Sequence, residues 1–172
     1  MPAPLDFSPY IRATLASLQA ELPDRIAVYN GEAANVHDLE VPITEAYYFG
    51  GDDTYVHMPK VEVAVPDGIN FDFSTQQADA AQGLSVSVSV WLEGETGEIP
   101  EMHEKVLGYG RVVAEVLLVP AAFGGGVSVT EVTALYPMIP TGAVNPETRS
   151  FDKWRTLAVL EFTLNDVARR PL

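Results

Sequence analysis

The chain has 172 residues, with 24 aspartate and glutamate residues against 10 lysine and arginine residues, no cysteine, and a formal net charge of −14. A chain of this length predicts one domain that can fold without disulfides or a structural metal. The lack of cysteine excludes thiolate catalysis, iron–sulfur clusters and zinc bound by cysteine. The large negative charge argues against phosphate binding, because lysine and arginine drive that binding by displacing counterions.

The negative charge is concentrated in the first part of the chain. Residues 1–104 contain 18 acidic and 3 basic side chains and have a net charge of −15, whereas residues 105–172 have a net charge of +1. No apolar run approaches the roughly 20 residues that span a bilayer, and the N-terminus lacks the basic start and apolar core of a signal peptide. We therefore expect a soluble protein that is made in the cytosol and has no membrane partner.

The first regular element that the sequence predicts is a helix near the N-terminus. Ser8 and Pro9 are typical of a helix start, and apolar residues spaced three and four apart predict a helix over 9–21 that ends before Pro23. Because its apolar stripe is narrow, we expect the helix to lie on a sheet with its other face in water. A short strand is expected over 25–29.

Residues 30–58 show no sustained periodicity and predict a long irregular arm with one short strand at about 44–49. The arm contains the aromatic residues Tyr47, Tyr48 and Phe49. An exposed aromatic cluster would suit docking on a neighbouring molecule. The alternative is that the cluster packs back on its own domain.

Alternating apolar and polar residues predict strands in the centre of the chain. Lys60–Val65 has this pattern, and Leu84–Leu92 has it most clearly, with valines on one face and serines on the other. The second segment therefore predicts a half-buried strand of an antiparallel sheet. We expect the polar segment 69–82 to be a loop.

A long helix is predicted over 99–119, where apolar residues recur at helical spacing after a proline and an acidic first turn. Gly108 and Gly110 would each cost this helix about 1 kcal/mol, which indicates that another part of the protein approaches its backbone closely. Strands are then predicted over 127–136 and 153–164. The chain ends in a short tail that we expect to be mobile.

These elements predict a single α+β domain over residues 1–172: an antiparallel β-sheet with helices packed on one face, comprising the N-terminal helix and one long central helix. The irregular arm at about 30–58 is an insertion in this domain. The sequence contains no internal repeat and no linker that would divide the chain.

No catalytic motif is visible in the sequence. The Gly-x-Ser-x-Gly and Ser-x-x-Lys motifs are missing, and the run Gly124–Gly126 precedes a strand and lacks the Lys-Ser/Thr ending of a phosphate-binding loop. His57, four and five residues after Asp53 and Asp52, could form a small metal site, and a solvated acidic loop is the alternative. His103 is expected on the surface. We predict no catalytic residue, no cofactor and no bound metal.

The order of elements from residue 60 onward resembles that of the tail terminator proteins of long-tailed phages. The resemblance covers most of the chain as an architecture and is carried by the helix Ser8–Glu21, the strand Lys60–Val65, the strand Leu84–Leu92 with Val90-Trp91 near its end, the helix Pro100–Val119, and the strands Val127–Tyr136 and Trp154–Leu164. Two segments, the arm 30–58 and the loop 137–150, are longer than is common in that family. Their roles cannot be inherited from it.

The resemblance implies a ring, usually of six copies, that caps the finished tail tube, stops its polymerisation and joins the tail to the head connector. The implied partners are further copies of the chain, the tail-tube protein and the connector or neck proteins. The implied location is the head-proximal end of the tail in the virion, after synthesis in the host cytoplasm. DNA would pass through the lumen as unbound cargo, so we expect acidic residues from positions 1–104 to line the channel.

Three other functions remain open at this point. They are another neck or head-completion protein of the same virion, a small metal-dependent enzyme that uses Asp52, Asp53 and His57, and a host assembly chaperone that is absent from finished particles. For the contacts between ring copies, the residues selected from expected exposure are the aromatic cluster Tyr47, Tyr48 and Phe49, the loop residue Phe123, and the outward-facing Arg155 and Glu161.

Overall fold

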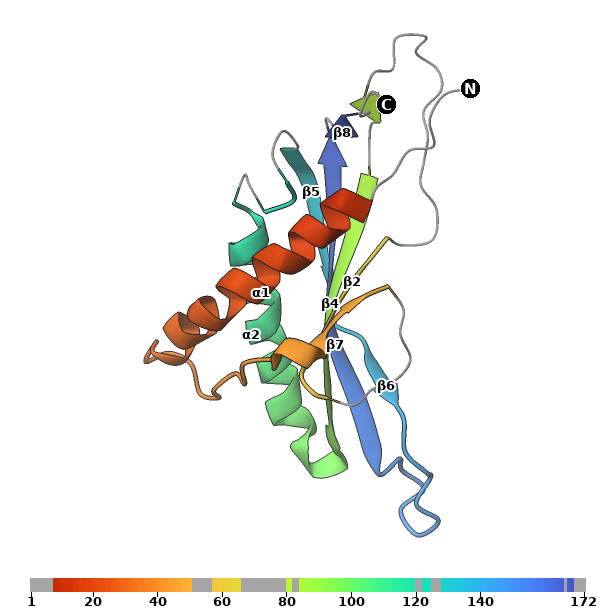
Figure 1. The fold of residues 1–172 in the computed structure, drawn as a ribbon. Coiled ribbons are helices and arrows are strands. Elements are labelled where there is room, and N and C mark those ends of the chain that lie inside the picture. Colours follow the sequence, from red (N-terminus) through yellow and green to blue (C-terminus); the bar gives the residue numbers. More distant parts are fainter. Residues whose placement is uncertain are drawn as a thin grey trace.

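A β-sheet covered on one face by helices makes up the part of the chain that the structure describes (Figure 1). The structure is a computed structural model and describes residues 8–50, 57–65, 80–81, 84–119, 122–124, 128–165 and 167–168. The helices α1 (Ser8–Asn30) and α2 (Ile99–Leu117) lie on the same side of the sheet. Within the described residues, neither is both long and apolar enough to cross a membrane. The predicted α+β class, with helices on one face, is confirmed.

Six strands of the described residues form the main sheet, in the order β1-β2-β4-β7-β5, with β6 also paired to β7. Their bounds are β1 (Tyr47–Phe49), β2 (Lys60–Ala64), β4 (Leu84–Glu95), β5 (Ser128–Leu135), β6 (Met138–Pro140) and β7 (Lys153–Asn165). A separate antiparallel pair joins β3 (Ala80–Ala81) to β8 (Val167–Ala168). Short 3₁₀ turns, η1 (Thr44–Ala46) and η2 (Thr96–Glu98), precede β1 and α2.

The main sheet is mixed, so the prediction of an antiparallel sheet is wrong for one pair of strands. β1 runs parallel to β2, whereas the other pairs are antiparallel. β1 and β2 are separated in the sequence by residues 50–59, a longer connection than the two-residue turn that can join antiparallel neighbours. The short strand expected at about 44–49 is confirmed as β1.

β4 lies at the centre of the sheet and follows the alternation in its sequence. Val86, Val88 and Val90 are fully buried under the helices, while the serines between them are only half-buried on the other face. β4 pairs antiparallel with β7 along its whole length. The predicted half-buried strand is confirmed, and it continues beyond Leu92 to Glu95.

α1 is longer than predicted, and the strand expected over 25–29 is wrong. The helix continues through Pro23 to Asn30. Leu22 and Ile26 continue its apolar stripe and are both fully buried. Burial of this stripe outweighs the one backbone hydrogen bond that a proline cannot donate, so the local stop signal does not end the helix.

The arm after α1 is irregular, as predicted, and hydrogen bonds tie it to both helices. The Asn30 side chain donates to the Leu39 carbonyl oxygen at 2.9 Å and accepts from the Leu39 amide at 2.8 Å. The Tyr109 hydroxyl of α2 donates to the Glu40 carbonyl oxygen at 2.6 Å. Leu39 is itself buried, so this part of the arm packs on its own domain.

α2 confirms the predicted central helix, and its two glycines face aromatic side chains. A Cβ atom at Gly108 would lie 2.7 Å from the Tyr29 hydroxyl oxygen. A Cβ atom at Gly110 would lie 2.5 Å from the Tyr136 hydroxyl oxygen and 2.9 Å from a ring carbon of the same residue. The close approach that these glycines predict is therefore confirmed.

The C-terminal strands are largely those predicted. β7 confirms the strand expected over 153–164, and β5 confirms most of the strand expected over 127–136. β6 lies inside the expected loop 137–150, and β3 lies inside the expected loop 69–82, most of which is outside the described residues. The tail predicted to be mobile, after Ala168, also lies outside the described residues.

Gly110→Ala is expected to lower the unfolding free energy by about 1 kcal/mol. Overpacking against the Tyr136 ring costs about 1–3 kcal/mol, which exceeds the roughly 1 kcal/mol of helix propensity that alanine adds. In a Tyr136→Ala background the ring is absent, so the same substitution should raise the unfolding free energy. Urea denaturation of the four proteins measures both differences. A loss of stability in both backgrounds would contradict this explanation.

Candidate functional site

β5 is the last strand of the sheet, and its outer edge is free within the described part of the chain. Each side chain from Thr130 to Leu135 is exposed, so the strand meets solvent on both faces. A strand in a sheet covered on one face ordinarily buries every second side chain. The helices pack mainly on β1, β2, β4 and β7. Val129 at the start of β5 packs against the core, and residues 130–135 are left with an edge and two faces available to a partner.

Exposed apolar side chains lie along this side of the sheet, on both of its faces. Val132 and Leu135 of β5 are 37% and 54% exposed, and Ile139 of β6 and Val144 after it are 42% and 53% exposed. β5 and β6 both pair with β7 on the side opposite β4, and the hairpin between β6 and β7 extends beyond the rest of the sheet (Figure 1). We call these four residues the β5–β6 edge.

The opposite edge of the sheet also exposes apolar side chains. β1 is the first strand in the order, and its Phe49 is 53% exposed. Val41 and Ile43, in the arm before it, are each 48% exposed. We call these three residues the β1 edge. Within the described residues, both ends of the sheet thus present a free outer strand edge together with apolar side chains, a combination typical of interaction surfaces.

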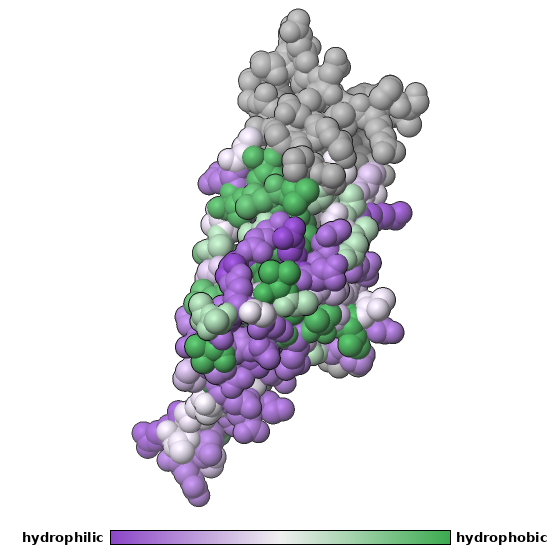
Figure 2. Space-filling view, turned by 90° about the vertical axis from the view of Figure 1, so that its left-hand side faces the viewer, coloured by the Kyte–Doolittle hydropathy of each residue, from purple (hydrophilic) through white to green (hydrophobic). Residues whose placement is uncertain are grey.

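The helix-covered side of the molecule differs from these edges. Figure 2 shows apolar patches on that side, interrupted by hydrophilic side chains. Exposed apolar residues of this side include Val28 of α1, Leu107 of α2 and Leu118 after α2. The backbone groups of a helix interior are already paired, so these patches offer a partner side chains but no free strand.

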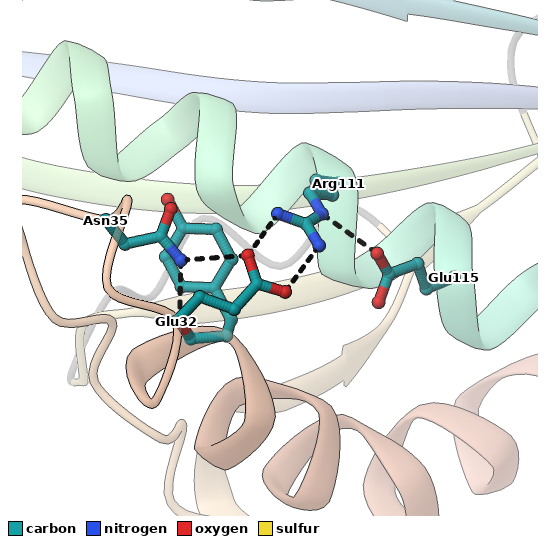
Figure 3. A network of polar contacts seen from close by, with 5 residues as sticks. Glu32, Asn35, Arg111 and Glu115 are labelled. Atoms are coloured by element: carbon teal, nitrogen blue, oxygen red, sulfur yellow. Dashed lines mark hydrogen bonds and ion pairs between the residues drawn. The ribbon is translucent and has the colours of Figure 1, made fainter.

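Arg111 of α2 joins this helix to the segment after α1 (Figure 3). Its guanidinium donates two hydrogen bonds to the Glu32 carboxylate, both at 2.7 Å, and a third to Glu115 at 2.9 Å. Asn35 donates to the Tyr29 carbonyl oxygen at 2.6 Å and to Glu32 at 3.4 Å. The guanidinium also lies 5.6 Å from the centroid of the Tyr29 ring. One arginine therefore fixes the start of the arm to α2.

The Arg111 pair shifts the pKa values of both partners toward the charged forms. Hydrogen bonds from Arg111 hold the pKa of Glu32 below its usual range. Hydrogen bonds to Glu32, and then to Glu115, raise the pKa of Arg111. These side chains are exposed to solvent, which limits what the pair contributes to stability.

A cavity of about 400 Å³ lies between the arm and α2 and is lined in part by His37, Leu107 and Arg111. Its two basic side chains already contact carboxylates. Arg111 pairs with Glu32, and Nε2 of His37 lies 3.2 Å from a carboxylate oxygen of Glu104. The residues that line this cavity therefore offer an anionic ligand no unpaired cation.

The histidines do not form a metal centre in the described part of the chain. No group of three or more histidine, aspartate or glutamate side chains there is placed to hold a metal ion. His57 is exposed, and His103 is exposed on α2, as expected. Asp52 and Asp53, the carboxylates of the hypothetical metal site, lie outside the described residues.

The predicted aromatic interface packs largely on its own domain. Of its three residues, Phe49 is exposed. Tyr47 is half-buried, and its buried hydroxyl has no hydrogen-bond partner within the described residues. Burial raises the pKa of Tyr47 to about 12. Tyr48 is also half-buried, with its ring centroid 5.0 Å from Nζ of Lys60. The expected exposure is therefore wrong for most of this cluster.

Phe123 is buried, so the exposure expected for it is wrong. The side chain is 1% exposed, and its ring lies 5.3 Å from the ring of Phe162 in β7. The Ser17 hydroxyl of α1 donates to the carbonyl oxygen of the preceding residue, Ala122, at 2.9 Å. The segment after α2 thus packs against α1 and brings Phe123 into the core, although the neighbouring glycines favour a loop in solvent.

Arg155 and Glu161 lie on the helix-free face of β7, as expected for outward-facing residues. Arg155 Nε donates to a Glu93 carboxylate oxygen of β4 at 2.8 Å. Glu161 lies opposite Ser87 of β4 and is partly exposed. β7 has neighbouring strands on both sides, so neither residue lies on a free edge, and their part in an interface stays a prediction.

The sequence alone gives no sign of a buried ion pair on the helix-free face. Lys60 has no exposed surface, and its Nζ lies 3.1 Å from a carboxylate oxygen of Glu62. The rings of Tyr48 and Trp91 lie 5.0 and 5.6 Å from the same Nζ. The alternation in β2 places Lys60 and Glu62 on one face, but the strand register brings the two rings to them.

The β5–β6 edge also escapes prediction, although the sequence carries one sign of it. In residues 128–135 each face of the strand receives both polar and apolar side chains, unlike the clean division in Leu84–Leu92. A strand without that division is not buried on one face. The position of this strand at the end of the sheet depends on the strand order. No local sequence pattern encodes that order.

Comparison with known proteins gives no assignment, because no family model matches the chain and no curated protein is significantly similar to it. The features that bear on function are therefore the two free edges, the one-sided sheet, the distribution of charge and the order of elements.

Lys60→Met is expected to lower the unfolding free energy by about 3 kcal/mol, because it leaves the Glu62 carboxylate buried without its cation. The double variant Lys60→Met/Glu62→Leu should lose clearly less, since neither charge remains. Urea denaturation of four proteins, the wild type, Lys60→Met, Glu62→Leu and the double variant, measures the coupling free energy between the two residues. Losses that simply add would contradict an energetic coupling between the two residues.

The Arg111–Glu32 pair predicts a pH-dependent contribution to stability. Folding lowers the pKa of Glu32, so the contribution is present above the unfolded glutamate pKa of about 4.3 and is lost as the pH falls through the lower folded value. The difference in Tm between the wild type and Glu32→Gln should be constant near neutral pH and shrink below about pH 4.

Thermal unfolding followed by circular dichroism between about pH 7 and about pH 3 measures this difference. Glu21→Gln is the matched control, because Glu21 is an exposed carboxylate of α1 that forms no ion pair with a described residue. The control should leave Tm unchanged throughout. A difference for Glu32→Gln that grows in acid is incompatible with the pair.

Proposed function

We propose that this protein is the tail terminator of a long-tailed phage, a structural subunit that forms a ring of six copies. The ring caps the head-proximal end of the tail tube, ends its polymerisation and joins the tail to the head connector. In this proposal the chain is a virion protein without a catalytic role. Its partners are its own copies, the tail-tube protein and the neck proteins.

The observation that carries the proposal is the exposure of residues 130–135 of β5 on both faces and along the outer edge. Ordering a strand costs about 1–2 kcal/mol of backbone entropy per residue, and burial of side chains normally offsets that cost. In the single chain every side chain from Thr130 to Leu135 is exposed. A free edge of this kind is a template for pairing with another chain. A subunit of a permanent assembly would cover it.

The order of elements supports the same function. The main elements follow one another in an order similar to that of tail terminators: α1, β2, β4, α2, β5 and β7. The arm before β1 and the hairpin after β6 are additions to that pattern. Such a protein acts through its surfaces, so it needs the free edges and not a catalytic constellation.

The charge of the chain suits a channel through which DNA passes. Six copies at −14 each would carry −84. An acidic lumen repels phosphate groups, so DNA can move through it without binding. We expect acidic residues from positions 1–104 to line this channel. A ring structure with a neutral or basic lumen would contradict this part of the proposal.

The proposal is tested by adding the purified protein to the polymerising tail-tube protein of the same phage. We expect shorter tubes with a ring at one end, measured by negative-stain electron microscopy. Tubes of unchanged length without end rings would overturn the proposal. Binding to the connector without binding to the tube would instead identify another neck protein.

A pair of matched variants links capping to the free edge. Leu135→Lys should abolish capping, because a charge on an edge strand opposes pairing with a neighbour. Leu118→Lys is the matched control, because Leu118 is 58% exposed and Leu135 is 54% exposed. Leu118 follows α2 and lies away from the β5–β6 edge, so this variant should cap tubes as the wild type does. Circular dichroism and Tm establish that both variants fold. Equal capping by the two variants would separate the function from the β5–β6 edge.

A further inference from the structure

We infer that copies of this chain join head to tail, with the β5–β6 edge of one copy docked on the β1 edge of the next. The inference rests on the proposed function, because it names the contact that would build the ring. The occupant of each free edge is therefore a second copy of the same chain, presenting its other edge.

The strand order supplies the geometry for this contact. β1 and β5 are the two ends of one sheet, so a contact between them uses different surfaces on the two copies. Repeating such a contact adds copies in one direction and gives a ring when the rotation closes. A contact between two β5 strands would instead stop at a dimer and would leave both β1 edges uncovered.

The two edges are also alike in the kind of surface that they present. β5 offers eight residues along its free edge, and β1 offers three. Leu135 and Ile139 lie exposed on one edge, and Ile43 and Phe49 lie exposed on the other. Joining the edges would pair free backbone groups and remove apolar side chains from water in the same contact.

Charge favours contact between a β1 edge and a β5–β6 edge over contact between two β1 edges. Glu40 and Glu45 flank the β1 edge; both are exposed, and neither forms an ion pair with a described residue. Two β1 edges would bring these carboxylates of both copies together, and like charges across a contact are unfavourable. Residues 128–155, which contain the β5–β6 edge and its hairpin, have three acidic and three basic side chains. This neutral edge accepts the acidic one without that repulsion.

Introduced thiols test the contact without background, because the chain has no cysteine. Thr44→Cys places a thiol beside the β1 edge, and Thr133→Cys places one on β5; both threonines are exposed. A short bis-maleimide is added to each single variant alone, to an equimolar mixture of the two, and to the double variant. Each reaction is run with and without tail-tube protein. Ala20→Cys, exposed on α1, replaces Thr44→Cys in the control mixture.

We expect neither single variant to link to itself, the mixture to give dimers only, and the double variant to give a ladder that ends at the ring. The control mixture should give no product. Dimers from Thr133→Cys alone would overturn the inference, because like edges would then meet. No product from the mixture, with and without tubes, would also overturn it and would leave the β5–β6 edge to a different protein.

The two proposals fail separately. If wild-type protein caps tubes while the mixture gives no linked product, the head-to-tail contact is wrong and the terminator function stands. If the double variant gives the ladder while wild-type protein leaves tube length unchanged, the contact stands and the terminator function is wrong.

Discussion

The alternation of valine and serine along β4 is the constraint on which the rest of the structure depends. Successive side chains of a strand point to opposite faces, so the valines commit one face of the sheet to the core, and both helices pack there. β7 pairs with β4 throughout and divides in the same way, with Ala158 and Leu160 buried and Glu161 partly exposed. The helices cover the middle of this sheet, and its outermost strand is left uncovered. The free edges are thus a consequence of how the core is built.

Basic residues are scarce in this chain, and two of them hold its acidic segments in place. Lys60 is one of three basic residues in positions 1–104, and it lies buried beside Glu62. Arg111 reaches from α2 to Glu32, at the start of the arm. The first pair neutralises an acidic group within β2, and the second neutralises one where α2 meets the arm; both reduce repulsion inside a chain of high net charge. The other carboxylates of the described residues are exposed or partly exposed, where they set the field that a neighbouring molecule meets.

The parts of the fold that could be predicted are those whose pattern is local. β4 and α2 bury side chains at the period of the element itself, so the sequence contains their pattern. Pro23 is a local signal for the end of a helix, but α1 extends beyond it because Ile26 is buried against the rest of the core. The burial of Phe123 and the pairing of Arg111 with Glu32 depend on residues far apart in the chain. The candidate interface depends on the strand order, and for that reason most residues selected for expected exposure lie elsewhere.

Prolines mark the segment that follows β5: Pro137 lies between β5 and β6 and has no amide hydrogen. Its carbonyl oxygen still accepts a hydrogen bond from the Leu157 amide at 3.1 Å, so the segment stays attached to β7. Because the Thr141 amide donates to the Lys153 carbonyl oxygen of β7, the preceding residue, Pro140, faces the outer side, where an incoming strand finds no amide donor from it. A proline on an edge strand limits the open-ended stacking that produces amyloid fibrils. Pairing along this side of the sheet is thus confined to a short stretch of β5 and β6, which favours one neighbour of defined length over an open-ended stack.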